Sequence, residues 1–149
     1  MKWLMILMLV GAMTAQAATV AGPKGGKLLE NDAPRAEFFV NADRKVEVRF
    51  YDADLRLLAP AEQRVTVIAE APTGKTQLAL VKEGDALVSA TPLPEGDGYR
   101  IVVRIQSAPE ARTQNFRITY HAEQCGGCNL AEYACTCDHA GEDHHGHAH

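Results

Sequence analysis

Hydrophobic and polar residues alternate along most of the chain, and this alternation constrains the fold more than any other feature of the sequence. In the clearest segment, residues 45–51, Val46, Val48 and Phe50 fall on one side and the intervening residues on the other. A period of two is that of a β-strand with one buried face, because successive side chains of a strand point to opposite sides. The segment is therefore predicted to be a strand, with Tyr51 among its outward side chains.

The same pattern recurs in residues 99–107, where Tyr99, Ile101, Val103 and Ile105 are predicted to point inward and Arg100, Arg104 and Gln106 outward. Together with weaker runs, the predicted strands are 27–30, 35–40, 45–51, 64–71, 76–82, 86–91, 99–107 and 116–120. Turn-forming Gly, Pro, Asn and Asp separate them at short intervals, and no long window keeps a helical period. The prediction is a mainly β fold, a single Ig-like antiparallel β-sandwich of seven or eight strands.

The first residues have the pattern of a removable export signal. Lys2 provides a positive start, an apolar run follows, and Ala15-Gln16-Ala17 matches the small residues before a signal-peptidase cleavage site. Residues 1–17 are predicted to be the signal, which leaves 149 − 17 = 132 residues in the mature protein. The run is short for a hydrocarbon core of about 30 Å, so we expect no stable membrane anchor after cleavage, the alternative being an uncleaved anchor. The predicted location is the periplasm or the exterior, which are oxidising compartments.

Charge and motifs exclude several functions. The chain has 15 Lys and Arg against 19 Asp and Glu, a formal net charge of −4, and no basic run that would predict a nucleic-acid partner. Gly74-Lys75-Thr76 lacks the earlier glycine of a phosphate-binding loop, because Ala69 occupies that position. No Ser, His and Asp set stands out as a nucleophilic constellation, so the sequence predicts no enzyme.

The composition changes at Cys125, because all four cysteines and five of the six histidines lie in the last 25 residues. A C-x-x-C pair is followed by two further cysteines and a histidine, which gives five soft ligands within 15 residues: Cys125, Cys128, Cys135, Cys137 and His139. Two glycines inside the first pair free the backbone, and residues 129–134 are predicted to form a short helical turn that brings the second pair back. Thiolate and imidazole ligands at this spacing predict a site for Zn²⁺ or Cu⁺.

Beyond this cluster the chain is rich in histidine, with His144, His145, His147 and His149 beside acidic residues. Neutral imidazole binds Zn²⁺ and Cu²⁺, so these residues are predicted to capture metal ions loosely. The predicted organisation is a signal at 1–17, a β-sandwich domain at 18–122 and a Cys/His-rich metal-binding tail at 123–149. His121 is either an additional ligand or a surface histidine.

Other interpretations of the same residues stay open. In an oxidising compartment the cysteines would form two structural disulfides, with pairing across the two clusters favoured because a bridge between Cys135 and Cys137 closes a very small ring. A thiol redox motif is less favoured, because the thioredoxin context of strand and helix is missing. The alternative for the terminal histidines is a purification tag, which is less favoured because Gly146 and Ala148 interrupt the run.

Part of the chain resembles a known family. The residues that carry the likeness are Gly-Pro-Lys-Gly-Gly-Lys-Leu-Leu at 22–29, Phe-Phe-Val at 38–40 and Val-Glu-Val-Arg-Phe-Tyr at 46–51. This pattern resembles the small periplasmic β domain at the front of some adaptor subunits of heavy-metal efflux pumps of the resistance-nodulation-division class, and related short secreted proteins of unknown function. The likeness extends over residues 22–120. In those adaptors a histidine often occupies the position of Lys24. Any metal ligand that this histidine provides is therefore missing from the present chain.

The resemblance implies a periplasmic, metal-related β-sandwich that acts beside a divalent-metal or copper exporter. A mature chain of 132 residues has no room for the regions that join an adaptor to its pump, so the chain is not expected to be an adaptor. The predicted function is a secreted protein that captures Zn- or Cu-type ions and buffers them or hands them to a metal efflux adaptor or pump. The alternative is a disulfide-stapled interaction module with no metal role.

Overall fold

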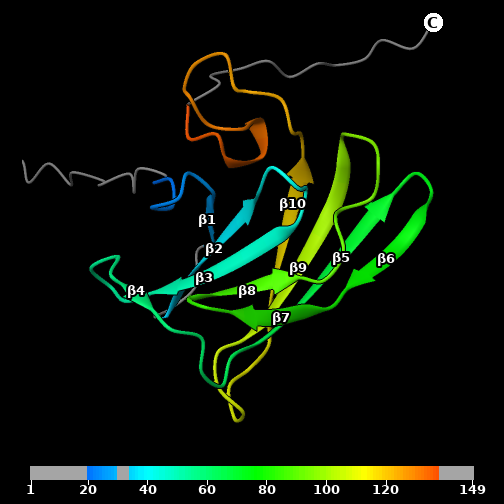
Figure 1. Cartoon of the computed structure of the whole chain (residues 1–149). Helices are drawn as coiled ribbons and strands as arrows, with labels where there is room; N and C mark the ends of the chain where they lie inside the picture. Colours follow the sequence, from blue (N-terminus) through cyan, green and yellow to red (C-terminus); the bar gives the residue numbers. More distant parts are fainter. Residues whose placement is uncertain (1–19, 30–33, 138–149) are drawn as a thin grey trace, which may run out of the picture.

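The computed structural model describes residues 20–29 and 34–137 of the chain, and in this part it consists of two antiparallel β-sheets (Figure 1). The first sheet has the order β1 (Lys27–Leu29), β2 (Arg35–Val40), β3 (Val46–Tyr51), β8 (Ala86–Ser89) and β7 (Leu80–Glu83), and β4 (Leu57–Leu58) also pairs with β3. The second sheet has the order β10 (Gln114–Tyr120), β9 (Tyr99–Gln106), β5 (Arg64–Ala71) and β6 (Gly74–Leu78). The mainly β fold is therefore confirmed, and the Ig-like assignment stays a prediction.

The alternation that predicted the strands also identifies the core. Val46, Val48 and Phe50 of β3 are fully buried, as predicted. Ile101 and Val103 of β9 are equally buried, and side chains from both sheets belong to one hydrophobic cluster. Removing this apolar surface from water is the main favourable contribution to folding.

The strand count differs from the prediction, because the described residues contain ten strands rather than seven or eight. Residues 76–82 were predicted to be one strand, and this is wrong. The chain forms β6 in the second sheet and β7 in the first, with Ala79 between them. The carbonyl oxygen of Ala79 accepts a hydrogen bond from the N–H of Ala90 (2.9 Å). The two sheets are thus connected directly at the edge formed by β6 and β7.

Tyr51 lies on the outer side of the first sheet, as predicted, but it is buried rather than exposed. Its hydroxyl donates a hydrogen bond to the carboxylate of Glu37 (2.6 Å), which is itself only 1% exposed. The other oxygen of Glu37 accepts hydrogen bonds from the backbone N–H groups of Lys24 (2.9 Å) and Gly26 (2.8 Å). A buried carboxylate is tolerated when its oxygens are hydrogen-bonded, and here these bonds fix the glycine-rich turn against β2.

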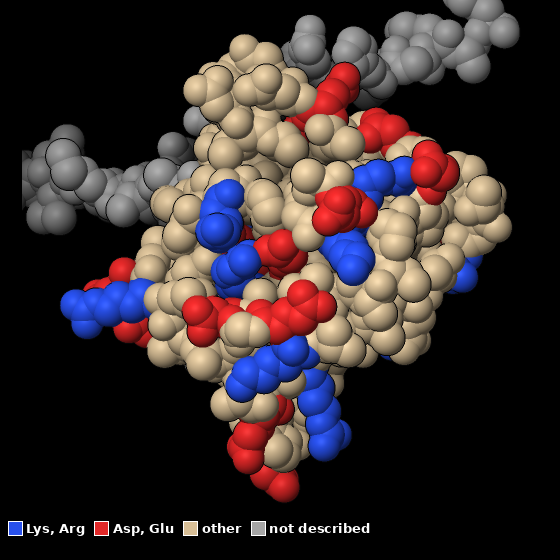
Figure 2. Space-filling model, viewed as in Figure 1, with Lys and Arg blue, Asp and Glu red and all other residues tan. Residues whose placement is uncertain are grey.

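No helix in the described residues has the length and apolar character needed to cross a membrane. The predicted signal at residues 1–17 and the end of the predicted first strand at residue 30 lie outside the described residues. On the face shown in Figure 2, acidic and basic side chains are interspersed.

Replacing Gly26 with alanine should destabilise the protein by about 1–3 kcal/mol, the usual cost of overpacking. A Cβ at this position would lie 2.4 Å from the carbonyl oxygen of Phe38, and a backbone atom cannot easily give way. Gly126→Ala is the matched control, because a Cβ there would meet nothing within 4 Å. Urea unfolding of both metal-free, reduced variants would measure the difference, and equal stabilities would contradict the prediction.

Candidate metal centre

The four cysteines lie in residues 121–137, which we call the cysteine segment. It leaves the end of β10 and folds back over the edge of the sheets (Figure 1). A short antiparallel bridge between Gln124 and Ala131 closes the loop that carries Cys125 and Cys128. The backbone N–H of Cys125 donates to the carbonyl of Leu130 (2.8 Å). Backbone hydrogen bonds therefore hold the first pair of cysteines in a tight loop.

The second pair follows a single turn of 3-10 helix, η1 (Glu132–Ala134), which agrees with the helical turn predicted for residues 129–134. This turn contacts both β1 and β10, which are edge strands of different sheets. It reverses the chain so that Cys135 and Cys137 return toward the first pair.

Tyr133 fixes the cysteine segment to the core. It is 6% exposed and belongs, with Ala134, to the same hydrophobic cluster as the strands. Its ring packs edge-on against Phe38 (centroids 5.8 Å apart, planes at 89°) and lies 5.7 Å from the ring of Tyr120. Its hydroxyl oxygen accepts a hydrogen bond from the backbone N–H of Val40 (2.9 Å). The sequence pattern predicts that Tyr133 lies in the helical turn, but it does not indicate that this residue anchors the segment.

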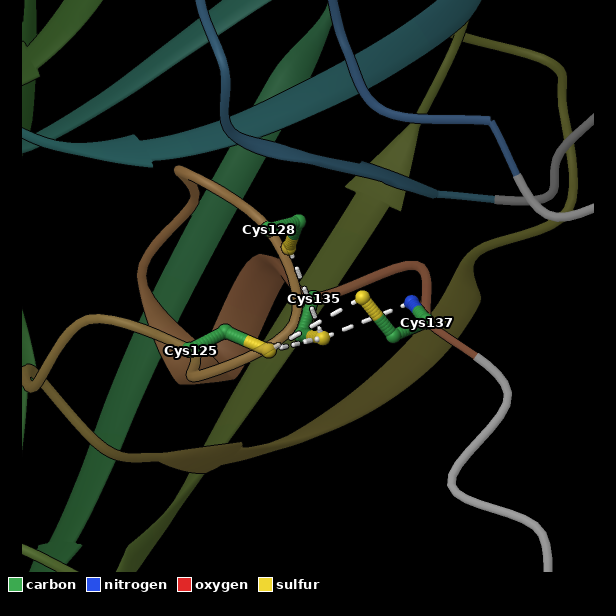
Figure 3. A group of neighbouring side chains, drawn as sticks. All are labelled: Cys125, Cys128, Cys135 and Cys137. Carbon is green, nitrogen blue, oxygen red and sulfur yellow. Dashed lines mark hydrogen bonds between the residues drawn. The ribbon is translucent and has the colours of Figure 1, made fainter.

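The four sulfur atoms converge on one point, as the spacing predicted (Figure 3). All four Sγ atoms lie within 4.8 Å of one another. The Sγ of Cys135 is 3.7 Å from that of Cys128, and the Sγ atoms of Cys125 and Cys137 are 4.0 Å apart. Zn–S bonds of about 2.3 Å in a tetrahedron place sulfurs about 3.8 Å apart, so both distances fit a metal ion. The cluster can therefore hold one ion.

One sulfur pair is closer than a tetrahedral metal site requires. The Sγ atoms of Cys125 and Cys135 are 2.7 Å apart, and the N–H of Cys137 donates to the Sγ of Cys135 (3.4 Å). A disulfide bond has an S–S length of about 2.05 Å, and none joins any of these four described cysteines. Binding of an ion by all four sulfurs would move this pair apart by about a further 1 Å, to a separation of about 3.8 Å.

Only one of the two glycines in the C-x-x-C motif is required by the packing. A Cβ on Gly127 would lie 2.9 Å from the Sγ of Cys137, whereas Gly126 has open space around it. Glycine at position 127 thus allows the second cysteine pair to approach the first.

The cysteines differ in acidity. The backbone N–H of Leu130 lowers the pKa of Cys128 to about 7, because it stabilises the thiolate. The pKa of Cys125 is raised by its hydrogen bond with Cys135, and that of Cys137 by its hydrogen bond with Cys128. Cys128 is therefore the sulfur most ready to bind a cation at neutral pH, and metal binding must displace protons from the others.

His121 is near the start of the cysteine segment but belongs to a different contact. Its Nδ1 lies 2.7 Å from a carboxylate oxygen of Asp97, and the other oxygen of Asp97 accepts the N–H of Ala122 (2.9 Å). These bonds lower the pKa of Asp97. Among the described residues, the group that could hold a metal ion consists of the four cysteines and does not include His121. Asp97 carries no motif that would have revealed this pairing in the sequence.

The predicted ligands His139, His144, His145, His147 and His149 lie outside the described residues. Comparison of the chain with protein-family models, curated proteins and solved structures found no match.

Stability should fall when the pH is raised from about 10 to 12. Burial raises the pKa of Tyr133 to about 12, against the opposing effect of the hydrogen bond from Val40, and burial also raises the pKa values of Tyr99 and Tyr120. A raised pKa stabilises the fold fully below the unfolded-state value of about 10, and this stabilisation is lost as the pH rises through the folded-state value.

The test is urea unfolding of wild type and Tyr133→Phe at pH 8 and pH 11.5. The variant loses the acceptor for Val40, so its free energy of unfolding at pH 8 should be lower by about 1 kcal/mol. Between pH 8 and pH 11.5, the free energy of unfolding of the variant should fall by less than that of wild type. Identical losses would mean that Tyr133 does not contribute to the alkaline sensitivity.

Proposed function

We propose that the protein is an exported binder of heavy-metal ions of the Zn²⁺ or Cu⁺ type. The observation that carries this proposal is the convergence of four cysteine sulfurs, all within 4.8 Å of one another, on a segment fixed to the core. Clusters of four thiolates are typical of tetrahedral Zn²⁺ sites, and soft thiolates also select Cu⁺. No other arrangement in the described residues offers comparable chemistry for a cation.

In this proposal the cluster holds the ion and the histidine-rich tail captures it. His144, His145, His147 and His149 would exchange ions rapidly, because individual imidazoles bind weakly and independently. The cluster would bind more tightly because four thiolates share one ion. Export follows from the predicted signal at 1–17, and transfer to a metal efflux adaptor or pump follows from the resemblance at residues 22–120. The protein acts by binding rather than by catalysis.

The second candidate is an interaction module stapled by disulfides. The 2.7 Å approach of the Cys125 and Cys135 sulfurs favours it, because this pair is already closer than a tetrahedral site requires. Oxidation in the periplasm or the exterior would join these sulfurs and remove two metal ligands at once. Thiol titration of denatured protein taken from its native compartment separates the candidates: four thiols support the metal site, and none supports the stapled module.

Removing one cluster cysteine should weaken metal binding by about two orders of magnitude. Small four-ligand zinc sites have apparent binding energies of about 10 kcal/mol or more, so each ligand contributes about 2.5 kcal/mol. Cys125→Ser and Cys137→Ser should show this loss for Zn²⁺ and for Cu⁺, measured by competition with a chromophoric chelator under reducing conditions. The loss of binding free energy in the double variant should be smaller than the sum of the two single losses, because both cysteines bind the same ion.

Thr136→Ala is the matched control, since it lies between two cluster cysteines and offers no thiol. It should keep the affinity of wild type. If reduced wild type binds Zn²⁺ and Cu⁺ no more tightly than Cys125→Ser, the proposed metal site is wrong.

Deleting residues 140–149 should remove a weak, pH-sensitive class of sites and leave the cluster site in place. Free imidazole has a pKa of about 6.5, so protonation prevents ligation as the pH falls from about 7 to 5. Calorimetric titration with Zn²⁺ at both pH values would resolve the two classes in full-length protein and in the truncated variant. Weak sites that persist in the truncated variant, or that are unchanged at pH 5, would exclude the tail histidines as their ligands.

A further inference from the structure

The outer face of the second sheet is strongly basic, although the whole chain has a net charge of −4. The strand registers place six charged side chains on this face. Five are cationic and one is a carboxylate: Arg64, Lys75, Arg100, Arg104, Arg117 and Glu70. The neighbouring residues of β9, such as Ile101 and Val103, point into the core. The alternation of the strands has therefore gathered positive charge on one surface.

Part of this face is hollowed into a depression of about 340 Å³, lined by Glu70, Arg100, Val102, Arg104, Asn115 and Arg117. Asn115 of β10 is directly opposite Arg104 of β9, and Arg117 is opposite Val102. Arg104 and Arg117 are consequently diagonal neighbours on adjacent strands, at about 7–8 Å, within reach of long side chains. Their guanidinium groups can meet above Val102, beside the amide of Asn115.

The carboxylate in the depression is already engaged. Glu70 forms ion pairs with Lys75 (2.9 Å) and with Arg100 (2.7 Å). In the described part of the chain, no carboxylate lies within ion-pairing distance of Arg104 or Arg117. Both are exposed, so their donors are accessible to a molecule from solution.

We propose that this depression binds a small multivalent oxyanion through Arg104, Arg117 and Asn115. The planar fork of a guanidinium matches a carboxylate or a phosphate with two parallel hydrogen bonds, and two forks favour a ligand with two negative charges. A compact ligand fits better than a long polyanion, because the net charge of −4 repels anionic chains beyond this face. The site is on the opposite side of the sheet from the core and does not depend on the proposed metal function.

The test is a titration of the mature protein at low ionic strength with inorganic phosphate and, separately, with succinate, followed by calorimetry or NMR shifts. Sodium chloride is the control for ionic strength. Saturable binding of either anion supports the site, and the tighter of the two identifies the ligand as phosphate-like or carboxylate-like. Arg104→Gln and Arg117→Gln should each weaken binding about tenfold, since each removes a charged pair of hydrogen bonds.

Arg112→Gln is the matched control, because it removes an exposed arginine from the loop between β9 and β10 and should leave the affinity unchanged. Glu70→Gln should strengthen binding, because it removes the competing carboxylate and releases Arg100. Unfolding curves will show that the variants are folded. Absence of binding by wild type, or an equal loss in Arg104→Gln and Arg112→Gln, would overturn the proposal.

Discussion

The contact of Tyr133 with the core is the interaction on which the arrangement of the cysteines depends. Its ring packs against Phe38 of β2 and Tyr120 of β10, which belong to different sheets. Its hydroxyl oxygen accepts a hydrogen bond from the N–H of Val40, so the polar end of this buried side chain has a hydrogen-bond partner. A cysteine-rich loop has little apolar surface of its own and cannot form an independent core. By attaching this loop to the sheets, Tyr133 gives four sulfurs a defined place in space.

The strands were predictable because a strand with one buried face has alternating apolar and polar residues, and this pattern is visible within a short segment of the sequence. Val46, Val48 and Phe50 show it in β3, and Ile101 and Val103 show it in β9. The change of sheet at Ala79 was not predictable, because Leu78 and Leu80 keep the same spacing on either side of it. A period of two reports which face is buried but not which strand is the partner. Burial of Tyr51 was missed for a similar reason, since its partner Glu37 comes from another strand.

Some features of the candidate site were likewise predictable from the sequence, and others were not. The convergence of Cys125, Cys128, Cys135 and Cys137 could be predicted, because short spacing limits how far apart the sulfurs can lie. The anchoring of Tyr133 could not, because its hydrogen-bond partner Val40 is 93 residues away in the sequence. The outward direction of Arg104 was predicted, but its position beside Asn115 requires the register of β9 and β10. Contacts that depend on strand pairing therefore become visible only in the folded protein.

The two sides of the sheet pair are held in different ways. At one side, β6 and β7 are joined through the backbone at Ala79, so the sheets cannot separate there without breaking hydrogen bonds of both ladders. At the other side, β1 and β10 are bridged by η1, which is held to β2 by the packing of Tyr133 and by one hydrogen bond to its hydroxyl rather than by a continuous strand connection. Local opening therefore costs less free energy on the β1 and β10 side. Amide hydrogens near this side would exchange with solvent sooner. Proteolysis and unfolding under mechanical force would also begin there.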